Sequence, residues 1–255
     1  MSQPDNVTPA GALIPAVGAP TPVDALVPVE APTSADALVP ADALALADAL
    51  TTPEGVADVF GAATASAIAY AGILATRGVE WGVIGPREVP RLWDRHLLNC
   101  AVVAELVEPE CATLADVGSG AGLPGVVLAM LLPKVDVILV EPLERRARFL
   151  ADCVAELGLT NASVLRGRAE DLGGQLSVDV VTARAVAPLE RLVPLTVGLV
   201  RRGGMVLAIK GSGAVDELRR AQPALRRVGA RSAEVLSIGH GKVNPAATVV
   251  RFFAR

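Results

Sequence analysis

Aromatic and reactive side chains are scarce in this 255-residue chain. Aromatic residues make up 3%, so Ala, Val and Leu must fill the core, although hydrophobic residues reach 52%. The two histidines, His96 and His240, lie far apart, and no two of the three cysteines are spaced as Cys-x-x-Cys. These absences argue against a metal centre, a disulfide framework and an aromatic platform for stacking bases.

Lysine and arginine are missing from residues 1–52, which hold six acidic residues, eight of the 19 prolines and a recurring "ADAL" unit. This composition predicts a low-complexity, disordered tail. The rest of the chain has 23 basic residues against the remaining 21 acidic ones, a net charge of +2. A polyanionic partner is therefore compatible with the sequence, although the formal net charge of the whole chain is -4.

A targeting segment is also missing from the pattern. The start of the chain has neither a basic stretch nor a clean apolar core, so no signal peptide is predicted. The longest uncharged run, residues 59–76, is rich in alanine and only weakly apolar. We interpret it as a buried helix and expect a cytoplasmic protein without a membrane contact.

Beyond the tail, two helices precede an alternating pattern. The Thr-Pro-Glu start at residues 52–54 predicts one long helix to Arg77, and Arg91–Val107 reads as a second helix. From Leu114, apolar strands alternate with helices, and the last two strands follow each other directly. The pattern predicts an α/β, Rossmann-like parallel sheet with helices on both faces and an antiparallel C-terminal hairpin. We divide the chain into a tail (1–52), a helical extension (53–110) and a core (111–255).

The stretch "LADVGSGAGLPG", residues 114–125, fits two glycine patterns at once. Gly120–Gly125 reads as Gly-x-Gly-x-x-Gly, which on its own indicates a dinucleotide. Asp116 with the glycines at 118, 120 and 122 matches the loop of methyltransferases that use S-adenosylmethionine. Both patterns need glycine because a tight strand-to-helix turn brings the backbone close to the ligand.

Three features favour the methyl donor. Asp116 precedes the glycines, where it would accept the donor's ammonium group, and Pro124 removes an N–H that a pyrophosphate would use. An acidic pair that includes Glu170 follows the third strand, where an acid commonly faces the adenine amino group. Glu141 ends the second strand and would bind ribose hydroxyls with either cofactor.

The main alternative is an NAD-type oxidoreductase that uses the same glycines. It predicts a catalytic His or a Tyr/Lys set, and the sole tyrosine, Tyr70, precedes the nucleotide fold. A second alternative is a non-catalytic ribosome-binding protein with a vestigial cofactor pocket. The retained Asp116, Glu141 and Glu170 argue against such decay. A methyltransferase of protein or small molecules also fits the motif spacing.

Several collinear motifs carry a more specific resemblance: "RLWDRHLLNCAVVAELV", "LADVGSGAGLPGVVLAMLLP", "VEPLERRARFL", "GRAEDL", "VVTARAVAPLERL" and "GGMVLAIKG". From about Phe60 to the C-terminus the chain resembles the RsmG family, also called glucose-inhibited division protein B. The resemblance implies an S-adenosylmethionine-dependent methyltransferase that modifies N7 of guanine 527 in 16S ribosomal RNA.

The resemblance also implies site residues. Cofactor-binding positions of the family fall on Gly118, Leu123, Ala169, Glu170 and Arg184, beside Asp116, Gly120 and Glu141 from the loop pattern. Guanine N7 has a lone pair and no proton, so the reaction needs alignment rather than a general base. Arg184, at the end of the fourth strand, is the candidate that helps to form the pocket where cofactor and guanine meet.

The upstream helix is expected to face the RNA. Arg91, Arg95 and His96 are the candidate contacts to 16S rRNA or the small ribosomal subunit, and the protein is expected to act as a monomer. The family often has "RHxxDS" here, whereas this chain has "RHLLNC". Asn99 and Cys100 thus replace Asp and Ser, which makes a charge-dependent role of those two positions doubtful.

Overall fold

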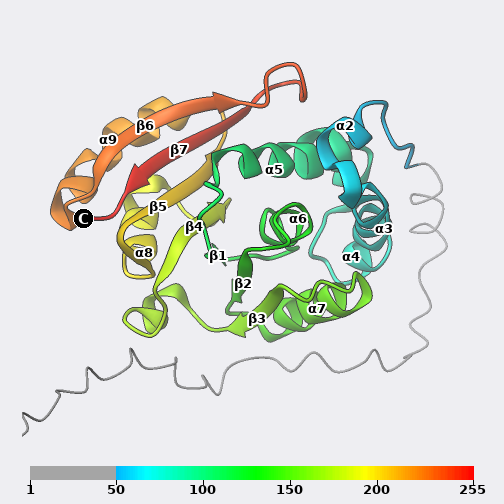
Figure 1. Ribbon diagram of the computed structural model, residues 1–255, viewed down its shortest axis with the longest axis horizontal. Coiled ribbons are helices and arrows are strands. Elements are labelled where there is room, and N and C mark those ends of the chain that lie inside the picture. Colours follow the sequence, from blue (N-terminus) through cyan, green and yellow to red (C-terminus); the bar gives the residue numbers. More distant parts are fainter. Residues whose placement is uncertain (1–49) are drawn as a thin grey trace, which may run out of the picture.

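The computed structural model describes residues 50–255, so nearly all of the predicted tail lies outside the described residues. A single twisted sheet with helices on both faces forms the body of the molecule (Figure 1). The strands are β1 (Thr113–Val117), β2 (Asp136–Glu141), β3 (Ala162–Arg166), β4 (Val178–Arg184), β5 (Val200–Lys210), β6 (Arg231–Ile238) and β7 (Ala247–Phe253).

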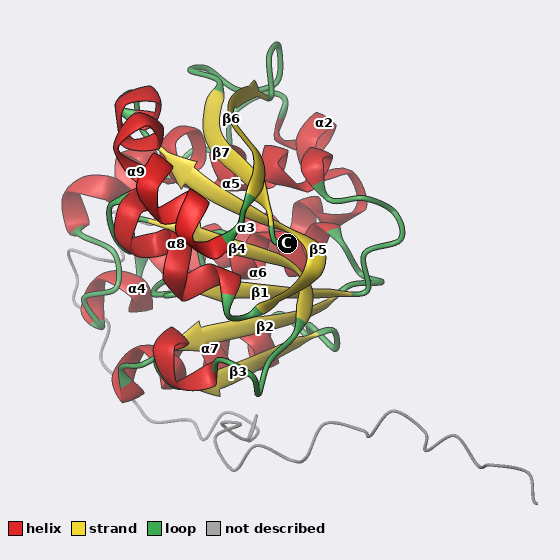
Figure 2. Ribbon diagram, turned by 90° about the vertical axis from the view of Figure 1, so that its left-hand side faces the viewer, coloured by secondary structure: helices red, strands yellow, loops and turns green. Residues whose placement is uncertain are grey.

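The sheet has the order β3-β2-β1-β4-β5-β7-β6. The neighbouring strands from β3 to β5 are followed most easily in Figure 2. The first five strands pair in parallel, so the carboxyl ends of β1 to β5 meet at one edge of the sheet. β7 pairs antiparallel with both β5 and β6. The predicted parallel sheet and antiparallel C-terminal hairpin are both confirmed.

Each face of the sheet is covered by its own helices. One core joins the N-terminal helices with α6 (Gly125–Leu131) and α7 (Glu144–Glu156), and the other lies beneath η5 (Ala169–Leu172), α8 (Leu189–Val197) and α9 (Ala214–Val228). Alternate residues of a strand point to opposite faces. Leu114 of β1 accordingly belongs to the first core, and its neighbour Ala115 belongs to the second.

The first predicted helix is broken rather than continuous, and in that respect the prediction was wrong. It consists of α2 (Val56–Phe60), η1 (Gly61–Ala63), α3 (Thr64–Ala75) and α4 (Arg77–Glu80). Gly61 has a φ of +51°, outside the right-handed α region, so α2 ends there. The stretch Val56–Glu80 is long and apolar enough to cross a membrane, with 39% of its most apolar window buried, but a core helix has the same properties.

The second predicted helix is one helical run with changing winding. It comprises η2 (Pro86–Arg91), η3 (Leu92–Leu97), α5 (Leu98–Ala101) and η4 (Val102–Leu106). The six residues of η3 are wound as a π-helix, and four of them are buried: Leu92, Trp93, His96 and Leu97. Such wide turns are rare and occur often at functional sites.

Candidate active site

The glycine loop connects the end of β1 to the start of α6. Its glycines at positions 118, 120 and 122 have φ values of +67°, +56° and +86°. The amide nitrogens of Gly118 and Ser119 donate to the carbonyl of Val140 in β2 at 2.8 and 3.1 Å. The loop therefore lies at the carboxyl edge of the sheet, where open α/β sheets bind ligands.

Close packing requires glycine at three positions of the loop: 118, 122 and 125. A Cβ added to Gly118 would lie 2.8 Å from Cγ2 of Val186, in the segment after β4. A Cβ on Gly125 would collide with Leu139 of β2 and lie 2.7 Å from Oδ2 of Asp116. Gly125 thus lets α6 pack directly on the sheet, and Gly118 lets Val186 pack directly against the loop.

Asp116 lies inside the protein rather than at the ligand face of the loop. Its side chain is fully buried, Oδ2 accepts from the Gly125 amide at 3.0 Å, and Oδ1 accepts from the Thr182 hydroxyl at 3.0 Å. The expected contact with the donor's ammonium group is therefore not supported by this orientation. Asp116 instead fixes the first turn of α6 to β1 and β4.

Burial also gives Asp116 a pH-dependent effect on stability. Desolvation raises its pKa from 3.8 to about 6, against the opposing effect of its hydrogen bonds. The folded protein thus binds this proton more tightly than the unfolded chain. The stabilisation is fully present below about pH 4 and is lost as the pH rises through about 6, on the order of 3 kcal/mol in total.

Asparagine has nearly the same shape as aspartate but does not ionise. We therefore expect the stability of Asp116→Asn to lack this contribution to the pH dependence. The measurement is urea unfolding of both proteins from pH 4.5 to 7.5. Wild-type stability should fall relative to the variant by about 2 kcal/mol over that range. A constant difference between the two proteins would contradict the assigned pKa shift.

Two further predicted cofactor residues lie at the same edge. Glu141 ends β2 and is 2% exposed, with Oε2 accepting from the Gly120 amide at 2.9 Å and Oε1 from the Leu143 amide at 3.0 Å. Glu170 follows β3 in the first turn of η5 and is exposed. Leu123 in the loop and Ala169 beside Glu170 are both buried at 8% exposure.

Tyr70 contributes to the loop from an element that the sequence patterns did not connect with it. This side chain of α3 is fully buried, and its hydroxyl donates to the carbonyl of Ala121 in the loop. A Cβ on Gly122 would lie 2.5 Å from Tyr70 Oη. Burial raises the pKa of the phenol well above its usual value, so the hydroxyl keeps its proton as a donor. The only sequence signal was a lone phenol in an alanine-rich helix.

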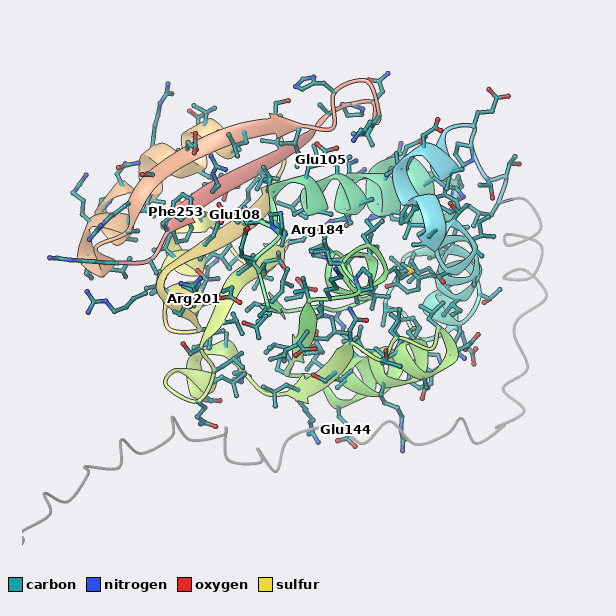
Figure 3. All side chains as sticks on the ribbon, in the orientation of Figure 1. Glu105, Glu108, Glu144, Arg184, Arg201 and Phe253 are labelled. Carbon is teal, nitrogen blue, oxygen red and sulfur yellow. The ribbon has the colours of Figure 1, made fainter. Side chains whose placement is uncertain are left out.

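Arg184 ends β4 and is held from beneath by the upstream helical run. Nη1 donates to Cys100 Sγ at 3.1 Å, and Nη2 contacts Nδ1 of His96. His96 Nε2 lies 2.8 Å from Oε2 of Glu88. Figure 3 shows Arg184 in the interior of the molecule, beside the helical run that contains α5.

The charges of Arg184 and Glu88 determine the tautomer and the protonation of His96. A guanidinium only donates, so His96 Nδ1 accepts from Arg184 and the ring proton sits on Nε2, which donates to Glu88. Burial and the positive charge of Arg184 lower the pKa of His96, which favours the neutral ring. The hydrogen bond from His96 in turn lowers the pKa of Glu88.

The three residues predicted to contact RNA differ in their exposure to solvent. Arg91 and Arg95 are exposed on η2 and η3. His96 is only 8% exposed, and both of its ring nitrogens have partners within the chain. The ring is thus not available as a phosphate contact in this structure, because a π-helical turn places it under Arg184.

A cavity of about 760 Å³ opens at the carboxyl ends of β4 and β5. Arg95, Asn99 and Arg184 line one part, and Lys210 with Glu217 line another. Lys210 Nζ lies 2.8 Å from both the Ala187 carbonyl and Glu217 Oε2, so its position is fixed.

The segment after β4 joins this cavity to the glycine loop. Val186 lines the cavity and also lies against Gly118. The preceding Ala185 has a φ of +56°, which is unusual for a residue with a side chain and is found most often at functional sites. Glycine loop, Arg184 and cavity thus form one continuous region, the candidate active site.

Comparison with known proteins gives a family for this site. The family profile described as rRNA small subunit methyltransferase G matches residues 63–244. A protein named ribosomal RNA small subunit methyltransferase G from Streptomyces coelicolor is 54% identical over 76% of this chain and 81% of its own length. One with the same name from Thermobifida fusca is 54% identical over the same shares.

The chain belongs to the rRNA small subunit methyltransferase G family. It is an S-adenosylmethionine-dependent rRNA methyltransferase, and the resemblance read from its motifs is confirmed.

A solved S-adenosylmethionine-dependent methyltransferase from Aquifex aeolicus overlaps with a TM-score of 0.49 at 21% identity, over 68% of this chain and 100% of that one. The strand order and the helix layers on both faces establish the fold of this chain. Within the described residues, no group of three or more His, Cys, Asp or Glu side chains is arranged to hold a metal ion.

Proposed function

We propose that this enzyme methylates N7 of guanine 527 in 16S ribosomal RNA, with the glycine loop holding the cofactor and the neighbouring cavity receiving the base. The observation that carries the proposal is the position of Arg184. It ends β4, lines the cavity and is immobilised by Cys100 and His96. Two residues later, Val186 touches both the cavity and the glycine loop.

The residues at the loop fit S-adenosylmethionine. The positive φ values of Gly118, Gly120 and Gly122 form a turn whose backbone carries no side chains, and Glu141 places a buried carboxylate beside Gly120. We assign Gly118, Gly120 and Leu123 to the floor of the cofactor site. Glu141 would accept hydrogen bonds from the ribose hydroxyls, the Ala169–Glu170 pair would contact the adenine, and Arg184 would face the reacting end. Bound S-adenosylmethionine supplies an electrophilic methyl group on a sulfonium.

The chemistry of N7 agrees with the groups that surround Arg184. Guanine N7 presents a lone pair without a proton, so no residue has to remove one during the attack. The chain's contribution is to align the base and the methyl group and to exclude water. His96 suits this reaction because it is neutral, buried and engaged at both nitrogens, which fits a positioning residue for Arg184 rather than a base.

The remaining assignments follow from the same arrangement. Exposed Arg91 and Arg95 would contact RNA phosphates beside the cavity, which Arg95 also lines. We propose that residues 53–110 are an extension that completes the site, because Tyr70 and His96 both come from it. The protein is proposed to act as a cytoplasmic monomer without a metal or a membrane contact.

The test is transfer of tritiated methyl groups from S-adenosylmethionine to purified small ribosomal subunits. We expect the label in the RNA fraction and none in ribosomal protein. Label in protein would overturn the proposed acceptor. Cofactor binding without any transfer to the subunit would favour the non-catalytic alternative.

A further inference from the structure

Five arginines gather at the end of the sheet opposite the cavity. We call this group the C-terminal arginine patch: Arg202, Arg226, Arg227, Arg231 and Arg255. Contacts join the segments that carry them. The Gly203 amide donates to the Ala254 carbonyl at 3.1 Å, next to Arg255. A Cβ on Gly229, just past α9, would lie 3.0 Å from Arg255 Cδ.

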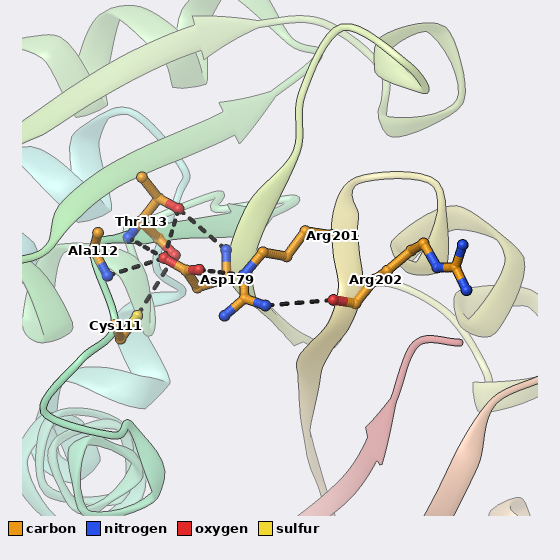
Figure 4. A network of polar contacts seen from close by, with 6 residues as sticks. All are labelled: Cys111, Ala112, Thr113, Asp179, Arg201 and Arg202. Atoms are coloured by element: carbon orange, nitrogen blue, oxygen red, sulfur yellow. Dashed lines mark hydrogen bonds and ion pairs between the residues drawn. The ribbon is translucent and has the colours of Figure 1, made fainter. Parts of the chain in front are cut away.

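The patch is exposed and lacks acidic partners. All five arginines are exposed, and none forms an ion pair within residues 50–255. Nearby arginines behave differently, since Arg201 is bound to Asp179 and Arg251 to Glu234. In Figure 4, Arg201 points at Asp179, whereas the guanidinium of Arg202 points away from that network.

The patch is distinct from the reaction site. Arg202 lies near the start of β5, and Lys210, which lines the cavity, lies at its end. β5 bulges between Val200 and Met205, and its regularly paired part from Met205 to Lys210 alone spans roughly 16 Å at about 3.3 Å per residue. The patch therefore cannot touch the base that occupies the cavity. A structured RNA has phosphates every few ångströms, so one RNA molecule can contact the cavity and the patch at the same time.

The chemistry of the patch favours phosphates over a protein surface. Protein interfaces centre on buried aromatic or aliphatic anchors. The exposed large hydrophobic residues of the described chain all lie outside the patch: Ile68, Leu143, Val186 and Val215. Guanidinium groups without apolar anchors bind phosphate oxygens well and release counterions when they do so.

We propose that the C-terminal arginine patch is a second contact surface for the ribosomal RNA backbone, remote from the methylated base. The proposal rests on the proposed function, because it takes a structured rRNA as the substrate. The patch adds affinity and orientation without sequence information, and the cavity selects the base.

The experiment compares two pairs of arginines on the same helix. Arg226→Gln/Arg227→Gln removes two members of the patch. Arg219→Gln/Arg220→Gln is the matched control, because Arg219 pairs with Asp216 at 2.9 Å and Arg220 with Glu190 at 3.8 Å. Affinity for small subunits and for protein-free 16S rRNA is measured from low to moderate salt, together with affinity for S-adenosylmethionine.

We expect the patch variant to bind both RNA substrates roughly ten-fold more weakly at low salt, with the salt slope reduced by about 2. Cofactor affinity should be unchanged, and the control pair should stay close to wild type. Equal effects of the two pairs, or an unchanged slope, would overturn the proposal. So would a loss confined to the intact subunit, which would indicate a ribosomal protein as the partner. A wild-type protein that binds no subunit at any salt would instead contradict the proposed function.

Discussion

Replacing Arg184 with alanine is expected to lower kcat/KM for methyl transfer on the order of 100-fold while leaving the fold intact. Among residues 50–255, Arg184 is the only charged side chain that both lines the cavity and contacts His96 and Cys100. Its loss removes a fixed positive charge from the junction of loop and cavity. Because the side chain is half-buried rather than part of the apolar core, the melting temperature should change little.

The design includes two further variants. Arg184→Lys keeps the charge, but its single ammonium cannot replace both guanidinium contacts, so we expect partial activity. Arg251→Ala is the matched control, since it removes a half-buried strand arginine whose partner is Glu234 at 2.7 Å. Its cofactor affinity should equal that of wild type. Full activity of Arg184→Ala would remove this residue from the site.

Replacing Gly125 with alanine is expected to destabilise the protein by about 3 kcal/mol. The added Cβ would collide with Leu139 and press on Asp116 Oδ2, both of which are fully buried. Relief requires α6 to move away from β1 and β2. This movement would also strain the hydrogen bond from the Gly125 amide to Asp116.

Urea unfolding of Gly125→Ala against Gly72→Ala measures the effect. Gly72 lies within α3, and a Cβ there meets nothing within 4 Å. Alanine at that position should therefore stabilise the protein, by about 0.5 to 1 kcal/mol. Equal unfolding midpoints for the two variants would contradict this prediction, because they would show that α6 can move away from the sheet without lowering the free energy of unfolding.

The strands and the glycine loop were predictable because their signals are local. Apolar runs of strand length, separated by helical patterns, were enough for the five parallel strands and the hairpin. Gly118, Glu141 and Glu170 could be placed at the carboxyl edge because each stands at the end of a strand or soon after it, and parallel strands bring their carboxyl ends to one edge. Chain order alone contains this information.

The errors and omissions depend on tertiary contacts. Side chains alternate between the two faces along β1, so Asp116 lies on the same face as Leu114 and points toward α6. The loop motif alone did not reveal this orientation. His96 is withdrawn from the surface by a π-helical turn. Tyr70 and Glu88 reach the site across 51 and 8 residues of sequence, and no spacing rule connects them with their partners.

The position of the transferred methyl group tests the proposed reaction most directly. Small subunits are labelled with tritiated S-adenosylmethionine, and the RNA is then cleaved chemically at N7-methylguanine and mapped. We expect one cleavage, at guanine 527, and a roughly 100-fold slower appearance of both label and cleavage with Arg184→Ala. Label on another atom or another nucleotide would leave the methyltransferase fold in place and contradict the proposed substrate.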